Sequence, residues 1–462
     1  MIGTETVSIF TIEDTYGSKR RDENENNEDI FNQKSLYMAV LSFIKITTFC
    51  VLFAIPWTTV PRTNSIIHRS HWMEVLLPVS SSFILSAGSF LMDLRFWTQE
   101  KALISVSVYL KMYLIILTPC TVLYIACHMI WSLWLHYNHP LPYLAIVCLL
   151  PTWSIWPFAL WYILPSVLLE NLGFRFKLRI YMNYFAWFLI MVFQNEVLSF
   201  LFANAPTGSQ FLVVFLLAAC QKFDIKLRSK LIFKMMGNLN EAGMAILAAD
   251  VNIMYSTFIA IRLVGAEWAT VYCSVVVGFA SHLWMTYRIV KDSRKIINVD
   301  LEIQNSGRNA QITKLIIAEL IEGLAPIIYG IHIAMAYYGP NAHIFSNVGN
   351  SYWSKAMKDI RPVLLIMSIL FVVDLLSVMI NSFLLWKILN VNMFKQFKEV
   401  LCKYWFIIAV PLELSMSLYL ACTDVNLGID ETHSYPWISR EGRQYLMYNL
   451  TEPAVNKKNS VL

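Results

Sequence analysis

Seven carboxylates lie within or near long apolar stretches of this sequence, where an ionised side chain is costly. A charge at the centre of a bilayer costs roughly 2.5–3.5 kcal/mol even on insertion scales, so such residues usually face a cavity or a partner. The basic residues in the same stretches are chiefly Lys45 and Lys111, which can neutralise two acids at most. The other acids must lie near an interface, be protonated or meet cations. The seven are Glu74, Glu196, Asp250, Glu319, Glu322, Asp374 and Glu413.

Asp374 is the deepest of these acids, with apolar residues on both sides of it in the sequence. Its side chain is too short to reach water from there, so we expect either a cation pathway or a structural partner such as Asn381 or one of the two intramembrane lysines. Asp250 is ten residues into its own stretch, and Glu413 follows Pro411 by two residues. A proline removes one helix hydrogen bond and so breaks the helix locally. Broken helices that carry acids near the middle of the membrane are typical of the ion sites of secondary transporters.

Glu319 and Glu322 are three residues apart, so a helix places both on one face. Two carboxylates that close repel each other unless a proton or a cation lies between them. The spacing therefore favours a proton relay or an inner vestibule. The alternative is that both lie in the first turns of a helix, among lipid headgroups, and are simply solvated.

Two histidine pairs offer a different chemistry. His68 with His71, and His136 with His139, are each three residues apart in segments predicted to be loops on the outer face. Four imidazoles that converge could bind Zn²⁺ or Cu²⁺. Loop histidines are more often solvated, and nothing in the sequence brings these two loops together.

The helices that carry these residues can be predicted from the composition, which is 57% hydrophobic and only 15% charged. A spanning helix needs roughly 20 apolar residues, and backbone groups in a bilayer must be satisfied within the segment. We therefore predict an all-α polytopic helical membrane bundle of ten or eleven transmembrane helices. The predicted spans are 37–60, 72–92, 109–134, 141–169, 180–204, 205–220, 241–264, 266–290, 315–338, 363–389 and 404–422.

The basic residues predict the orientation, because cytoplasmic loops carry an excess of Lys and Arg. With eleven spans and a cytoplasmic N-terminus, inside segments hold 24 of the 36 Lys and Arg, and outside segments hold 10. Residues 1–33 are then a disordered cytoplasmic tail, 34–422 the transmembrane domain and 423–462 a polar, extracytoplasmic C-terminal tail. That tail contains a glycosylation sequon at Asn449.

The sixth span is the weakest of the eleven, because its apolar run from 211 to 220 covers only about 15 Å. A re-entrant segment is the alternative, and it would leave ten spans. Residues 225–240 follow as an amphipathic helix with Lys226, Lys230 and Lys234 on one face. This face suits the anionic cytoplasmic leaflet, or else it is an ordinary solvated connector.

Function is predicted only by the acids. The leading hypothesis is a secondary transporter or permeation pathway for a cation, or for a small solute coupled to H⁺ or Na⁺. The alternatives are a non-transporting receptor or assembly subunit, in which the acids are structural, and a membrane-embedded enzyme with His128, His282 or His332 as its base. The dispersed basic residues do not suggest nucleic acid. The sequence contains neither a phosphate-binding loop nor a dinucleotide fingerprint, so no cofactor is predicted.

Overall fold

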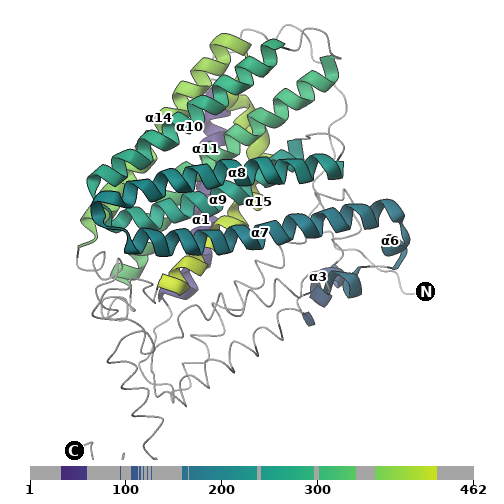
Figure 1. The fold of residues 1–462 in the computed structure, drawn as a ribbon, viewed down its shortest axis with the longest axis horizontal. Helices are drawn as coiled ribbons and strands as arrows, with labels where there is room; N and C mark the ends of the chain where they lie inside the picture. The colour runs from purple at the N-terminus through teal and green to yellow at the C-terminus, as the bar shows by residue number, and fades with distance from the viewer. Residues whose placement is uncertain are drawn as a thin grey trace, which may run out of the picture.

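The computed structural model describes residues 33–59, 106–112, 159–164, 166–236, 241–295, 301–339 and 359–423, with a few isolated positions between 94 and 126. Within those residues the protein is helical and has no strand (Figure 1). The predicted all-α bundle is therefore confirmed for the described part of the chain. The predicted span 72–92 lies wholly outside it, and the larger part of the spans 109–134 and 141–169 does as well.

The helices keep the order of the predicted spans. They are α1 (Gln33–Thr59), α3 (Val106–Met112), α6 (Ser166–Glu170), α7 (Leu172–Asn204), α8 (Gln210–Met236), α9 (Glu241–Arg262), α10 (Trp268–Lys295), α11 (Leu301–Tyr338), α14 (Arg361–Leu389) and α15 (Met393–Thr423), with short 3₁₀ turns at Thr207–Ser209 and Leu263–Gly265.

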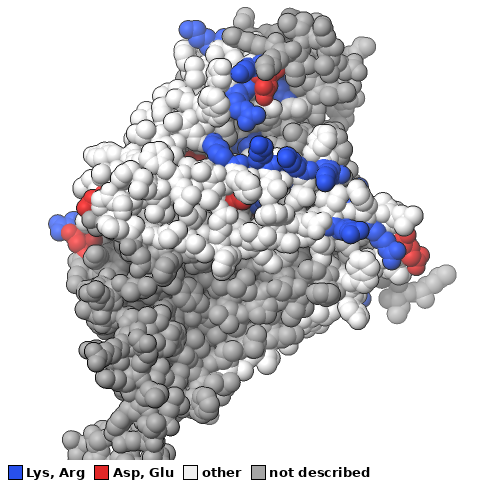
Figure 2. Space-filling view, in the orientation of Figure 1, with Lys and Arg blue, Asp and Glu red and all other residues white. Residues whose placement is uncertain are grey.

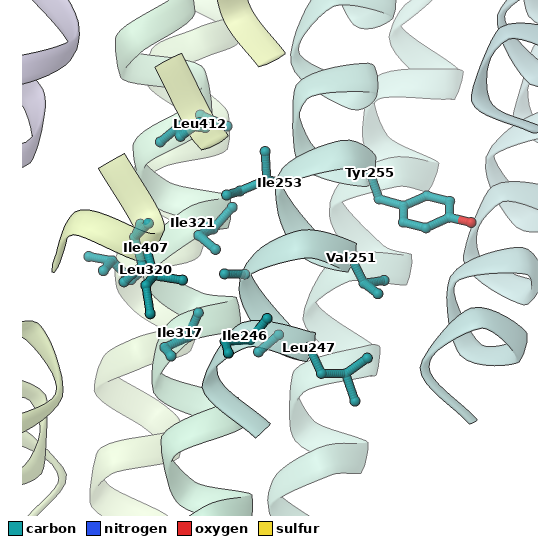
Figure 3. Close-up of a cluster of buried hydrophobic side chains, with 14 of the residues drawn as sticks. Ile246, Leu247, Val251, Ile253, Tyr255, Ile317, Leu320, Ile321, Ile407 and Leu412 are labelled. Atoms are coloured by element: carbon teal, nitrogen blue, oxygen red, sulfur yellow. The ribbon is translucent and has the colours of Figure 1, made fainter. Parts of the chain in front are cut away.

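Helices α9 and α11 form the centre of the bundle and pack along each other. Nearly every residue of α9 is buried, and the many alanines of α9 and α11 let the two backbones approach closely. Figure 3 shows the contact: Ile246 and Ile253 of α9 face Ile317 and Ile321 of α11, with Ile407 of α15 beside them. Helices α1, α7, α8, α10, α14 and α15 surround this pair.

The outer helices are apolar on the surface as well as inside. Helix α14 has a mean hydropathy of 2.8 in its most apolar window, yet only 28% of that window is buried. Exposed Leu365, Leu375, Leu376 and Phe383 lie on its surface. An apolar helix surface of this kind is typical of contact with lipid rather than water. Five of the described helices are long and apolar enough to cross a bilayer, which is compatible with a membrane protein.

Two of the differences from the sequence prediction bear on the buried acids and the basic segment. Helix α8 is continuous over 27 residues, or about 40 Å, and so joins the predicted short sixth span to the basic segment that follows it. Helix α11 begins at Leu301, fourteen residues before the predicted start, and its apolar window runs from Gly307 to Met335. The change matters because Glu319 and Glu322 now lie in the middle of that window.

Basic side chains gather towards one end of the bundle. Figure 2 shows a row of Lys and Arg along α8 and a second group near the start of α7. The α8 row consists of exposed lysines at four successive turns, at positions 222, 226, 230 and 234. The starts of α9 and α15 lie together, because Lys403 Nζ is 3.6 Å from Glu241 Oε1.

Candidate functional site

The imidazole of His282 lies between two carboxylates in the middle of the bundle. Helix α10 carries His282, and α11 carries Glu319 and Glu322 one turn apart. The Nδ1 atom of His282 is 3.0 Å from Glu319 Oε1, and its Nε2 atom is 3.0 Å from Glu322 Oε1. Each ring nitrogen therefore lies within ion-pair distance of a carboxylate oxygen, a placement that suits the positively charged imidazolium.

Helix α14 completes the site with two neutral donors. Asn381 Nδ2 donates to Glu319 Oε1 at 2.6 Å, and Ser377 Oγ donates to the same oxygen at 3.1 Å. Thr286 of α10 donates to Asn381 Oδ1 at 2.8 Å, which fixes the amide with its nitrogen towards Glu319. We call His282, Glu319, Glu322, Ser377 and Asn381 the His282 cluster.

The two carboxylate oxygens of Glu319 differ in their hydrogen-bond partners. Oε1 faces His282, Ser377 and Asn381, whereas Oε2 is buried and has no hydrogen-bond partner among the residues that the structure describes. The Glu319 residue as a whole is only 1% exposed. A buried carboxylate oxygen without a donor carries a desolvation cost, which a bound proton or cation would remove.

The cluster lies deep within the apolar window of α11. Glu319 follows Gly307 by twelve residues, and Glu322 precedes Met335 by thirteen. At 1.5 Å per residue, each acid is about 18–20 Å from the nearer end of the apolar window. Pro326 also has no N–H to donate to the Glu322 carbonyl, so the helix hydrogen bonding is interrupted at this turn.

Asp374 adjoins the cluster from α14. It lies within electrostatic range of Glu322, His282 and Glu319. Its backbone passes close to α11 at Gly323, where an added Cβ would be 3.9 Å from the Asp374 Cβ. Three acids therefore surround one histidine, and a protonated His282 still leaves the group with an excess of negative charge when the acids are ionised.

Helix α8 reaches the edge of the same cluster through Lys222. Its Nζ donates to Ser281 Oγ at 2.6 Å, and Ser281 directly precedes His282. Lys222 is also within electrostatic range of Glu322, the more exposed of the two α11 acids. The cluster thus has a basic side chain on its α8 side and Asp374 on its α14 side.

Asp250 belongs to a different network, between α7, α8 and α9. Its Oδ2 is 2.7 Å from Arg228 Nη2 and accepts a 2.6 Å hydrogen bond from the Tyr184 hydroxyl. The Arg228 guanidinium also lies over the Tyr184 ring, 3.9 Å from its centroid. Next to this pair, Tyr255 donates to Asp224 Oδ2 at 2.5 Å and accepts from Gln194 at 3.2 Å.

Glu413 forms a third buried pair, with His332. The two atoms His332 Nε2 and Glu413 Oε2 are 3.4 Å apart, between α11 and α15, and His332 Nδ1 is 2.7 Å from the Ile328 carbonyl of its own helix. Cys50 of α1 lies in contact with the same region through the Ala409 carbonyl, at 3.7 Å. Glu413 is thus held by a different histidine from the one that bridges Glu319 and Glu322.

The remaining predicted residues fall outside what the structure describes. Glu196 lies on α7, but its side chain is not among the described ones. Glu74, the histidines at 68, 71, 136 and 139 and the sequon at Asn449 all lie outside the described ranges. Among the residues that are described, no group of three His, Cys, Asp or Glu side chains is arranged to hold a metal ion.

Sequence reasoning found the acids but missed most of their partners. The sequence places His282 and Asn381 in separate hypotheses, and no pattern in it pairs Arg228 with Asp250. A signal for the α14 side of the site does exist: Asp374, Ser377 and Asn381 are spaced i, i+3, i+7 and form one polar stripe on a very apolar helix.

Searches against protein-family models, curated proteins and solved structures returned no match to this chain.

Proposed function

We propose that this chain is a secondary transporter or permeation pathway that binds and releases protons at the His282 cluster, alone or coupled to a small solute. One observation supports this above the others. Three donors surround Oε1 of the buried Glu319, and none of the described residues donates to Oε2. One oxygen is therefore held in place, and the other is available to a proton.

The proposed proton-binding step takes place among three acids that have one histidine between them. With His282 protonated, Glu319 and Glu322 are each within 3.0 Å of a cation, and Asp374 adds a further acid. A proton arriving at Glu319 Oε2 or Asp374 reduces the net negative charge of the cluster. Its departure restores that charge, and this cycle is what coupled transport requires. A coupling Na⁺ is the alternative cation.

We also propose that the basic end of the bundle is cytoplasmic, with the N-terminus inside and the C-terminus outside. The starts of α7 and α15 and the second half of α8 carry its basic residues, in keeping with the positive-inside rule. Lys226, Lys230 and Lys234 then lie where anionic lipid headgroups are found.

The other predicted pathway acids receive separate roles in this proposal. Asp250 has a full complement of partners in Arg228 and Tyr184, so its role is to hold α8 against α7 and α9. Glu413 and His332 form a second titratable pair outside the His282 cluster. Glu196 remains a candidate on its sequence position alone.

The second candidate function is a receptor or assembly subunit that transports nothing. The Arg228–Asp250 network favours it, because that network shows buried charge used as interhelical structure in this chain. If the His282 cluster were equally structural, replacing Glu319 would lower stability and leave no transport defect to measure. A membrane enzyme, with His282 or His332 as its base, is the third candidate.

The experiment is proton flux into liposomes that contain the purified protein and a trapped pH-sensitive dye. Wild type is compared with Glu319→Gln, which preserves the side-chain shape but cannot take up a proton. The control is Glu399→Gln, since Glu399 is exposed near the start of α15. Flux in wild type and in the control, with loss in Glu319→Gln, supports the proposal. Equal flux in all three contradicts it, and absence of flux in all, with a range of cations tried, favours the receptor.

A further inference from the structure

Arg262 is a buried arginine for which the structure provides no counter-charge. It is the last residue of α9 and is 6% exposed. Its Nε atom is fully buried without a hydrogen-bond partner. No hydrogen bond or ion pair joins its guanidinium to any other residue that the structure describes.

Arg228 also has a buried Nε atom without a hydrogen-bond partner among the described residues, but its charged guanidinium has a counter-charge. Arg228 is also buried, at 1% exposed, but Asp250 lies 2.7 Å away and the Tyr184 ring covers its guanidinium. A buried charge without a partner is strongly unfavourable, because the attraction that would offset its lost hydration is missing. The burial of Arg262 therefore either lowers the stability of the folded protein or is offset by a bound anion.

The described surroundings of Arg262 do not supply that anion. Phe258 and Leu263, close to it in sequence, are buried apolar residues. Asp359 is held by its own pair with Arg361, at 2.9 and 3.0 Å. Glu267, five residues further along the chain, is exposed and forms no ion pair with Arg262.

One polar side chain does approach it. Tyr329 of α11 is buried and lies within electrostatic range of Arg262. Helices α9 and α11 pack together throughout, so these two residues face each other near the end of the bundle opposite the Glu241–Lys403 pair. The helix dipole at the end of α9 favours a cation there, but no hydrogen bond joins the guanidinium to a carbonyl group of the described residues.

We propose that Arg262 is the anchor of an oxyanion-binding site at this end of the bundle, which takes a carboxylate or a phosphate group. The planar guanidinium presents N–H donors in a fork that matches two oxygens of one anionic group. The apolar surroundings would strengthen that contact by excluding water. The site shares no residue with the His282 cluster, so anion binding can be measured even if the proposed proton binding at Glu319 is wrong.

Thermal unfolding of the purified protein in a neutral detergent tests this directly. We expect inorganic phosphate or acetate to raise the wild-type Tm by about 2–4 °C over chloride at equal ionic strength. Arg262→Met should lose this response. It should also unfold at a temperature equal to or above that of wild type in anion-free buffer, because the unpaired buried charge is gone.

The matched control is Arg361→Met, an exposed arginine whose partner is Asp359 and which should keep the full anion response. Arg262→Lys keeps the charge without the fork and should show a reduced response. A second series in vesicles of phosphatidylcholine with or without phosphatidylglycerol identifies the source of the oxyanion. Stabilisation by soluble anions indicates a small solute, and stabilisation only by the anionic lipid indicates a headgroup phosphate.

Two results would overturn the proposal. The first is a wild-type protein that responds to phosphate, acetate and anionic lipid no more than to chloride and neutral lipid. The second is an Arg262→Met protein with a lowered Tm and an unchanged anion response, which would make Arg262 a structural residue. The first result needs no variant, so the test holds even if Arg262→Met fails to fold.

Discussion

Lys222 of α8 donates a 2.6 Å hydrogen bond to Ser281, the residue that directly precedes His282 on α10. The contact brings a positive charge to the edge of the His282 cluster without placing it between the two carboxylates that His282 joins. Lys222 is therefore suited to adjust how readily the cluster takes up protons, rather than to bind them itself.

Replacing Lys222 by Gln should change the pH dependence of proton flux. The positive charge of Lys222 lies within electrostatic range of the cluster, so its removal makes the arrival of a proton there more favourable. We expect the pH of half-maximal flux to rise by on the order of one pH unit, which corresponds to about 1.4 kcal/mol. Lys226→Gln, one turn further along the same helix, is the control. A profile that moves equally in both variants would mean that only the general surface charge matters.

Thr286→Val should weaken the site through Asn381. The hydroxyl of Thr286 donates to Asn381 Oδ1, and this contact holds the amide nitrogen towards Glu319. Loss of a buried hydrogen bond with its acceptor left unpaired costs about 1–3 kcal/mol. Thermal unfolding should show the loss, together with lower flux. Ser368→Ala, which removes an exposed hydroxyl bonded to its own helix, should change neither quantity.

Asp250→Asn should reduce stability without abolishing flux in the protein that remains folded. The substitution leaves Arg228 buried and unpaired, which typically costs about 3–5 kcal/mol. The double variant Asp250→Leu with Arg228→Met removes both charges and should recover most of the lost stability. If instead Asp250→Asn folds normally and carries no flux, Asp250 belongs to the pathway and the structural role proposed for it is wrong.

The orientation can be checked by cysteine labelling in a version of the protein without its eight native cysteines. Arg361 at the start of α14 and Lys230 in the second half of α8 are both exposed. An impermeant maleimide applied to intact cells should label Arg361→Cys, and should label Lys230→Cys only after permeabilisation. The reverse pattern would invert the proposed topology, and labelling of both from one side would contradict the placement of these residues at opposite ends.

The sequence predicted the helices best where apolar residues run without interruption. The bounds of α9 and α14 agree closely with the predicted spans 241–264 and 363–389. Helix α11 was predicted to begin too late because Arg308 and Lys314 resemble loop residues in a linear reading. In three dimensions the residues between them, such as Ala310 and Ile312, are buried against the bundle.

The candidate site was predictable only in part, for a physical reason. Hydropathy shows that ionised side chains at Asp374, Glu319 and Glu322 are energetically costly, because this cost depends on the apolar residues nearby in the sequence. Which partner offsets each cost depends on packing between helices that are distant in sequence. The 36 residues between His282 and Glu319 thus carry no local sign that the two side chains lie 3.0 Å apart.

Pro326 gives α11 a natural hinge. The Glu322 carbonyl has no N–H from residue 326, so the helix can bend at the turn that carries Glu322. Glu319 lies before that turn, and Tyr329, the neighbour of Arg262, lies after it. An anion that draws Tyr329 towards Arg262 would therefore alter the bend, and with it the proton affinity of the His282 cluster. Linkage makes the effect reciprocal, so protonation of the cluster would change the affinity for the anion by the same factor.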